Sequence, residues 1–250
     1  MTTIATPHLD GKHVVFGEVI SSKSIVRHIE NMPTQSDKPA QDCTIVDCGE
    51  LTGADAENIP QRQPDKTGDP YEDYPEDQQT GEEELSGQEI LKIATDLKGF
   101  GNSAFKSLDN QVALDKYQKA LRYVHEYPEP LENDPPELGR QLNALKISCH
   151  LNSAQCYLKQ ENWERAKFST TAALEIEGIT EAESAKAYYR RALATAGLKD
   201  DELAIADLEK AQKAATGDKA IENELVKLRK RKAEREKKQK SALKGAFADL

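Results

Sequence analysis

Five side chains in the second half of the chain carry groups that can bind carboxylates. They are Lys98, Asn102, Asn152, Lys186 and Arg190. Lys98 and Asn102 are four residues apart, as are Lys186 and Arg190, and residues at this spacing project from one face of a helix. Ammonium, guanidinium and amide N–H groups donate hydrogen bonds to carboxylates. The residue types therefore predict a site for an acidic ligand.

A repeated pattern of small residues indicates which elements carry these side chains. The triplet Ala113, Tyr117 and Ala120 is spaced by four and then three residues, which places it on one helical face. The same steps recur at Ala166, Thr170 and Ala173 and at Ala204, Leu208 and Ala211. A helix-period segment precedes each triplet, over 97–105, 147–157 and 185–193. We interpret the triplets, together with Trp163, as packing residues where two helices cross.

Three helical hairpins are therefore expected, with the candidate binding residues on the first helix of each. The pattern resembles the tetratricopeptide repeat, a helix-turn-helix unit of about 34 residues. The predicted fold is mainly α, with three such repeats over 86–215 and a capping helix within 216–250. The Pro-rich stretch 126–136 separates the first repeat from the second and is expected to form a loop.

The five polar residues also match the two-carboxylate clamp of tetratricopeptide co-chaperones. Those proteins bind the acidic C-terminal peptide of the ninety-kilodalton heat-shock chaperone. The resemblance implies peptide-binding roles for Lys98, Asn102, Asn152, Lys186 and Arg190. A peptide ending in Asp presents a side-chain carboxylate beside its terminal carboxylate, and each charge-assisted hydrogen bond contributes about 1.5–3 kcal/mol.

The first fifty residues resemble a second family. Segments 6–20, 25–30 and 43–51 are similar to the C-terminal part of a cyclophilin, and the run Leu-Asp-Gly-Lys-His-Val-Val-Phe-Gly is specific. Residues 14–20 and 44–46 predict strands, and the amphipathic segment 22–32 predicts a helix. With the repeats, this partial domain over 1–52 resembles the forty-kilodalton cyclophilins, which are peptidyl-prolyl isomerases with a tetratricopeptide domain.

The resemblance implies an incomplete isomerase site. In that family the arginine, aromatic, methionine and glutamine residues of the proline pocket precede the matched segment. Only His8, Leu9 and His13 correspond to the pocket wall. We therefore expect no complete catalytic site, no stable barrel from residues 1–50, and a truncated or mis-started chain. The alternative function is an active isomerase that acts on the chaperone's clients.

Charge is distributed unevenly along the chain. The net charge is −10, with 37% hydrophobic and 31% charged residues. Residues 53–85 are rich in Pro, Gly, Gln and acids, which predicts a solvated linker. The basic segment 216–250 predicts a helix that packs Ile221, Leu225 and Leu228 inward. Calmodulin or another acidic protein is a candidate partner for this helix, whereas the lack of stacking aromatics argues against nucleic acid.

Other chemistry has little support in the residues. No His is spaced from Cys, Asp or Glu as in a metal site, and no Gly-rich phosphate loop occurs, so neither a metal nor a cofactor is expected. Cys149 and Cys156 are two helical turns apart, which is too far for a disulfide. Since no signal peptide or long apolar run is present, we expect a soluble cytoplasmic protein with no membrane partner.

Overall fold

The computed structural model describes residues 1–20, 22–53, 56, 64–78 and 84–246. The chain divides into two compact units, Met1–Leu85 and Ser86–Leu250. The second unit is helical and contains all five candidate binding residues.

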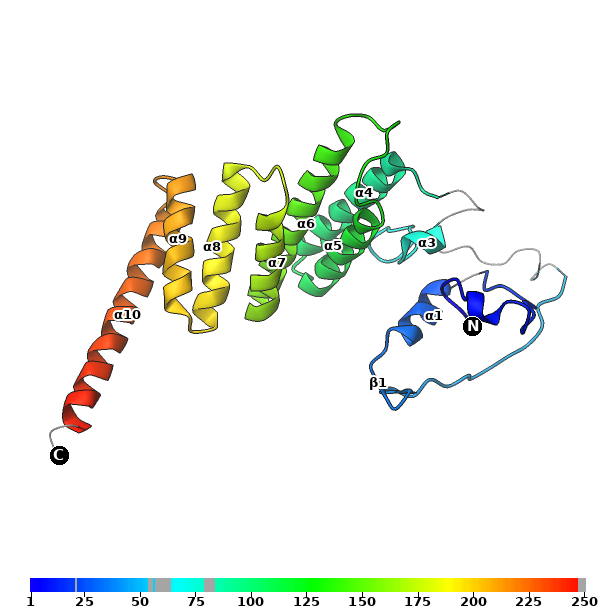
Figure 1. Cartoon of the computed structure of the whole chain (residues 1–250), viewed down its shortest axis with the longest axis horizontal. Helices are drawn as coiled ribbons and strands as arrows, with labels where there is room; N and C mark the ends of the chain where they lie inside the picture. Colours follow the sequence, from blue (N-terminus) through cyan, green and yellow to red (C-terminus); the bar gives the residue numbers. More distant parts are fainter. Residues whose placement is uncertain (21, 54–55, 57–63, 79–83, 247–250) are drawn as a thin grey trace. The chain divides into compact units, whose positions relative to one another are not determined.

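Six helices of the second unit form three hairpins that follow one another in chain order (Figure 1). The first helices of the hairpins are α4 (Gly87–Lys106), α6 (Leu138–Lys159) and α8 (Glu181–Gly197). Their second helices are α5 (Asn110–His125), α7 (Trp163–Glu175) and α9 (Asp201–Ala214). Besides the contacts within each hairpin, α6 contacts both α4 and α8, so the three first helices are neighbours. The predicted repeats are confirmed.

The turns inside the three hairpins share one local structure. Each contains a residue with positive φ: Leu108 at 64°, Glu161 at 56° and Lys199 at 66°. The next residue caps the second helix, and its side chain accepts a hydrogen bond from the backbone N–H three residues later; these caps are Asp109, Asn162 and Asp200. Because the left-handed residue reverses the chain and the cap starts the next helix, this pair fixes the hairpin turn.

The small residues of the repeat pattern lie in the helix crossings. Ala113, Ala120, Ala166, Thr170, Ala173, Ala204, Leu208 and Ala211 are each 0% exposed. Two glycines bring aromatic rings onto a neighbouring helix backbone. A Cβ at Gly101 would lie 2.6 Å from the Tyr117 ring, and one at Gly197 would lie 2.4 Å from the Trp163 ring. Any larger residue at these glycines would push the ring out of its packing position.

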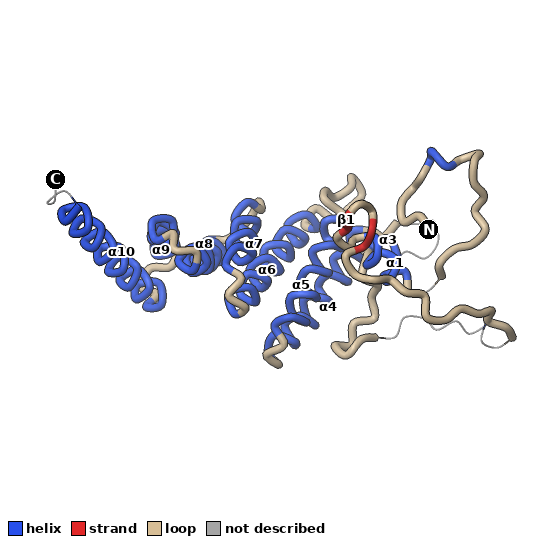
Figure 2. The backbone as a smooth tube through the Cα atoms, turned by 90° about the horizontal axis from the view of Figure 1, so that it is seen from below, coloured by secondary structure: helices blue, strands red, loops and turns tan. Residues whose placement is uncertain are grey.

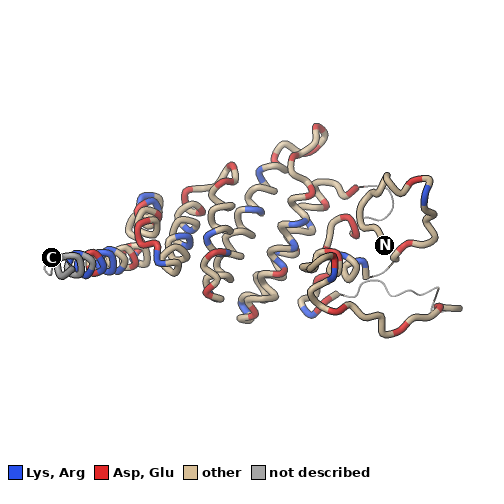
Figure 3. The backbone as a smooth tube through the Cα atoms, turned by 60° about the horizontal axis from the view of Figure 1, so that its bottom comes forward, with Lys and Arg blue, Asp and Glu red and all other residues tan. Residues whose placement is uncertain are grey.

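The helix α10 (Lys219–Ala246) covers the last hairpin. Its residues Ile221, Leu225 and Leu228 are 3%, 4% and 0% exposed and pack against α9, as predicted for a capping helix. Lysines and arginines recur along α10 (Figure 3). Several pair with acids of α9: Arg229 with Glu209, Lys232 with Glu202, and both Arg231 and Arg235 with Asp201. Part of the basic charge is therefore balanced within the unit.

The first unit contains little regular structure (Figure 2). Its elements are the 3₁₀ helix η1 (Pro7–Leu9), α1 (Lys23–Glu30) and an antiparallel pair of short strands, β1 (Thr34–Gln35) and β2 (Lys38–Pro39). The helix predicted over 22–32 is confirmed by α1. The strands predicted over 14–20 and 44–46 are wrong, because these residues form no strand.

Exposure explains why the β-branched run does not form a strand. Val15 and Phe16 are 92% and 101% exposed, and Val46 is 92% exposed. A strand needs a neighbouring strand to satisfy its backbone groups and a packed face to bury its side chains. Among the residues described in this unit, neither is present beside these segments. No barrel is formed by the described residues of 1–50.

The acidic segment 53–85, expected to be a solvated linker, has some local structure where it is described. Residues 64–78 include the short helix α3 (Pro75–Gln78), from which Asp77 pairs with Arg27 of α1. The guanidinium carbon of Arg27 also lies 5.1 Å from the centre of the Tyr74 ring. Ion pairing and this cation–π contact order the segment in place of aliphatic packing. The rest of the prediction at 54–55, 57–63 and 79–83 lies outside the described residues.

Candidate functional site

The five candidate binding residues lie on the first helices of the three hairpins. Lys98 and Asn102 are on α4, Asn152 is on α6, and Lys186 and Arg190 are on α8. Three of them line one cavity of about 210 Å³: Asn102, Asn152 and Arg190. The remaining residues in its lining are Phe105, Lys106, Tyr117 and Gln155. The fold therefore brings donors from three neighbouring helices to a single hollow.

The two candidate lysines are placed differently. Lys98 is partly buried one turn before Asn102, and Lys186 is exposed one turn before Arg190. Neither is part of the cavity lining. The charge of Lys98 acts on the buried thiol of Cys149, where it opposes the desolvation that raises the pKa of that thiol to about 12. A role for the lysines in the same site stays a prediction.

Hydrogen bonds fix the side-chain amides of the site. The Tyr117 hydroxyl donates to Asn102 Oδ1 at 2.8 Å, and Asn152 Nδ2 donates to the same oxygen at 3.2 Å. An amide oxygen has two lone pairs, so this oxygen is fully used. Asn152 also makes a hydrogen bond with the Tyr117 hydroxyl, so among the described residues the Asn102 Nδ2 group is the donor of the pair that has no partner.

Arg190 supplies the positive charge in the cavity lining that comes from α8. Its Nη1 donates to the backbone oxygen of Leu151 on α6 at 2.5 Å. Burial lowers the pKa of Arg190 below its usual value, but a guanidinium remains charged in proteins. Among the described residues no carboxylate lies within ion-pair distance of it. A partly buried cation without an acidic partner is costly, and an anionic ligand would balance it.

Sequence reasoning missed four residues of the cavity lining. Phe105 and Lys106 follow Asn102 by three and four residues, and Gln155 follows Asn152 by three, so helical spacing could have identified them. The ring of Phe105 is held from outside by Lys159, whose Nζ lies 4.6 Å from the ring centre. Tyr117 was interpreted as packing alone. No local signal identifies its hydroxyl as part of the site, because it reaches the site from α5.

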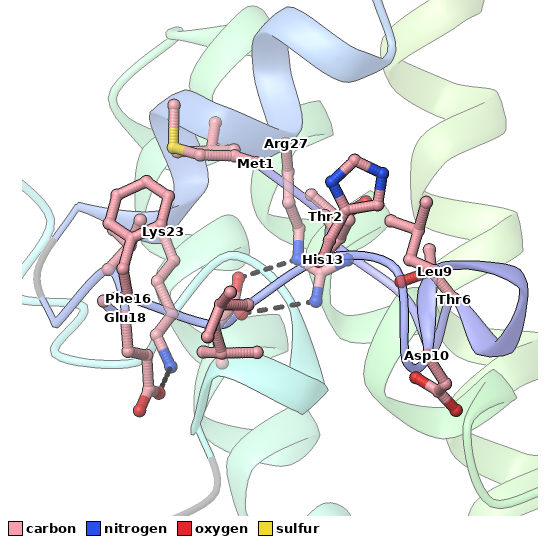
Figure 4. A pocket seen from close by; sticks show the side chains of 17 residues that line it. Met1, Thr2, Thr6, Leu9, Asp10, His13, Phe16, Glu18, Lys23 and Arg27 are labelled. Carbon is pink, nitrogen blue, oxygen red and sulfur yellow. Dashed lines mark hydrogen bonds and ion pairs between the residues drawn. The ribbon is translucent and has the colours of Figure 1, made fainter.

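A second cavity, of about 930 Å³, lies in the first unit and contains part of the expected isomerase wall (Figure 4). Leu9 and His13 line it, whereas His8 lies in η1 outside the lining. The guanidinium in the lining of this cavity is that of Arg27, which donates to both carboxylate oxygens of Asp77 at 2.8 and 3.3 Å. Because this guanidinium is already paired, the cavity offers no free guanidinium to polarise a prolyl amide.

Metal and membrane features are not found in the described part of the chain. Its residues contain no group of three or more His, Cys, Asp or Glu that could hold a metal ion. No helix among them is both long and apolar enough to cross a bilayer.

Comparison with known proteins agrees with both parts of the chain. The family described as cyclophilin type peptidyl-prolyl cis-trans isomerase/CLD matches residues 1–50. Among solved structures, the C-terminal TPR-containing domain of a Plasmodium falciparum FK506-binding protein is similar, with a TM-score of 0.54 and 27% identity. That alignment covers 61% of this chain and 97% of the other. Fold and matches together define a helical-repeat protein of the tetratricopeptide class joined to a cyclophilin segment.

Similarity to whole proteins identifies the family. The chain is 39% identical to peptidyl-prolyl cis-trans isomerase D of Mycosarcoma maydis over 99% of its own length and 66% of the relative's. It is 41% identical to isomerase D of Cryptococcus neoformans, covering 96% of this chain and 67% of that protein. The chain therefore belongs to the forty-kilodalton cyclophilins, the peptidyl-prolyl isomerases with a tetratricopeptide domain. It spans about two thirds of the length of these relatives.

Proposed function

We propose that the repeat unit binds the acidic C-terminal peptide of the ninety-kilodalton heat-shock chaperone. The observation that carries this proposal is Arg190, a partly buried guanidinium without an acidic partner among the described residues. It shares its cavity with the side-chain amides of Asn102, Asn152 and Gln155. A carboxylate in the cavity would neutralise this charge and accept hydrogen bonds from the Asn102 Nδ2 group.

Two further cations would extend the site. Lys98 and Lys186 each lie one helical turn from a residue of the cavity lining, Asn102 and Arg190 respectively. A lysine side chain is long and flexible, so its ammonium group can approach a ligand that occupies the cavity. A peptide ending in Asp has two carboxylates close together. We assign one of them to Arg190 with the amides and the other to the lysines.

The isomerase activity in the relatives' names is the other candidate function. In this chain the residues that match the isomerase wall, Leu9 and His13, share their cavity with an arginine already paired to Asp77. The residues that we propose for peptide binding line a cavity with a guanidinium that is unpaired among the described residues, whereas the guanidinium in the cavity of Leu9 and His13 is paired. We therefore assign the function of this chain to the repeat unit.

Calorimetric titration with a peptide that is acidic and ends in Asp tests the proposal. Lys98→Ala and Arg190→Ala should each weaken binding at least tenfold, equivalent to about 1.4 kcal/mol. Added salt should weaken binding to the wild type through screening. Lys213→Ala removes the same charge from an exposed position on α9 and serves as the matched control. It should leave the affinity within about twofold of wild type, as expected for a distant surface charge.

The peptide itself provides a second test. Amidation of its C-terminus removes one carboxylate without changing the side chains. Wild-type protein should bind the amidated peptide as weakly as Arg190→Ala binds the free acid. Equal affinity for the amidated and free peptides would refute recognition of the terminal carboxylate.

A further inference from the structure

We propose that Tyr117 is a positioning residue, whose hydroxyl orients Asn102 so that its amide N–H groups face the ligand cavity. This inference rests on the proposed function, because it concerns how the same cavity recognises a carboxylate. Tyr117 comes from α5, the second helix of the first hairpin, whereas the five expected binding residues all lie on first helices.

Packing determines where the hydroxyl lies. Tyr117 is 1% exposed, and its ring sits against the backbone of α4 at Gly101, with no room there even for a methyl group. Asn102 is the residue next to Gly101. The ring cannot move toward α4, so its hydroxyl is held beside Asn102 at the 2.8 Å hydrogen-bond distance.

The hydrogen bonds to Asn102 explain how the hydroxyl orients its amide. The oxygen and nitrogen of an asparagine amide have nearly the same shape, so only their partners decide which one faces the cavity. A tyrosine hydroxyl can donate or accept, but Asn152 hydrogen-bonds the Tyr117 oxygen, which leaves the hydroxyl proton for Asn102 Oδ1. Because Tyr117 and Asn152 both donate to Asn102 Oδ1, they keep this oxygen away from an incoming carboxylate. Without the hydroxyl, one of these two donors is lost, and the amide can turn to present its oxygen. An oxygen in that position would repel the ligand instead of binding it.

The hydroxyl keeps its proton under ordinary conditions. Burial is the main cause that raises the pKa of Tyr117 above its usual 10, and the hydrogen bond from Asn152 and then the charge of Arg190 oppose this only in part. A phenol that does not ionise near neutral pH remains a donor. The orientation of Asn102 should therefore not depend on pH in the neutral range.

Titration of Tyr117→Phe with the free and amidated acidic peptides tests the inference. The variant keeps the buried ring and removes only the oxygen. Affinity for the free-acid peptide should fall about fivefold to tenfold, the loss expected when one hydrogen bond to a charged group is weakened. Affinity for the amidated peptide should change less than twofold. A loss of folded protein would instead weaken both peptides equally, so an equal loss overturns the positioning role.

A double-mutant cycle separates positioning from an independent contact. The single variant Asn102→Ala should weaken binding of the free-acid peptide. Adding Tyr117→Phe to it should have no further effect, because the hydroxyl acts through Asn102. Additive losses would overturn the inference. Asn102→Asp is a matched variant that still accepts from Tyr117 and Asn152 but donates nothing, so it should bind the free acid at least as weakly as Asn102→Ala.

The outcomes distinguish this inference from the function on which it rests. If the wild-type protein binds the free-acid and amidated peptides equally, the proposed function fails, and the inference fails with it. If the wild type discriminates between the peptides and Tyr117→Phe does so equally well, the proposed function stands and Tyr117 has only a packing role.

Discussion

Arg190 and Arg191 are adjacent residues with different partners. Arg191 makes two hydrogen bonds to the fully buried carboxylate of Asp207, at 2.7 and 2.8 Å, and a third to Thr171. Arg190 points to the cavity and bonds only to a backbone oxygen among the described residues. The guanidinium of Arg191 therefore holds helices together, and that of Arg190 is the one we propose to bind a ligand. Consecutive helical residues face directions about 100° apart, which allows this division.

A pair of histidines leads to a prediction of how the stability of the repeat unit depends on pH. His150 of α6 lies with its ring centre 6.4 Å from that of His125 of α5. Burial, and then the positive charges of His125 and Lys146, lower the pKa of His150 to about 4. In the unfolded chain a histidine titrates near about 6.5, so the unfolded state binds the proton more readily between these values. Stability should therefore fall as the pH drops from about 6.5 to about 4.

Urea unfolding at pH 7 and pH 4 measures this effect. The contribution of His150 should be about 2 kcal/mol, less than the full shift implies because the ring is partly exposed. His150→Gln cannot titrate and should lose less stability over the same interval, while the carboxylates affect both proteins alike. The same pH dependence in the two proteins would show that His150 is not the responsible group.

At the scale of elements, the repeat unit is built from one hairpin used three times. The same left-handed residue and cap form each turn, and the same small residues lie at each crossing. The hairpins differ in their polar contacts. In the third hairpin a buried ion pair joins the two helices, Arg191 of α8 with Asp207 of α9, and Thr171 extends it to α7.

Breaking this ion pair should destabilise the unit. Asp207→Ala leaves the guanidinium of Arg191 in a mostly buried position without its partner, and we expect a loss of about 3 kcal/mol in unfolding free energy. Glu209→Ala is the matched control on the same helix, because it removes an exposed pair with Arg229 and should cost less than about 1 kcal/mol. Urea unfolding compares them. Similar losses in both variants would contradict the importance of the buried pair.

At the scale of the whole molecule, the two units differ in how completely their residues are packed. The repeat unit buries the small residues of all three hairpins, whereas the first unit leaves Val15, Phe16 and Val46 almost wholly exposed. The residues proposed to bind the acidic peptide lie entirely within the second unit. The proposed peptide binding should therefore not require a formed cyclophilin barrel.

The same difference predicts the outcome of an isomerase assay. Rotation about a prolyl bond faces a barrier of about 18–20 kcal/mol, and a catalyst must stabilise the twisted amide. With its cavity guanidinium paired to Asp77, this 250-residue chain should turn over a prolyl model peptide no faster than buffer. An active cyclophilin assayed in parallel is the control. Turnover above background that disappears in His13→Ala would contradict this expectation.

The sequence by itself determined the repeat architecture and the helix that carries each candidate ligand. Helical hydrogen bonds and caps are local, so the spacing of Ala113, Tyr117 and Ala120 was sufficient to predict a helix and its buried face. Tertiary structure alone decided that the Tyr117 hydroxyl meets Asn102 and that residues 14–20 form no strand. Both depend on a partner far away in the chain, because a cavity contact and a strand pair are made between distant segments.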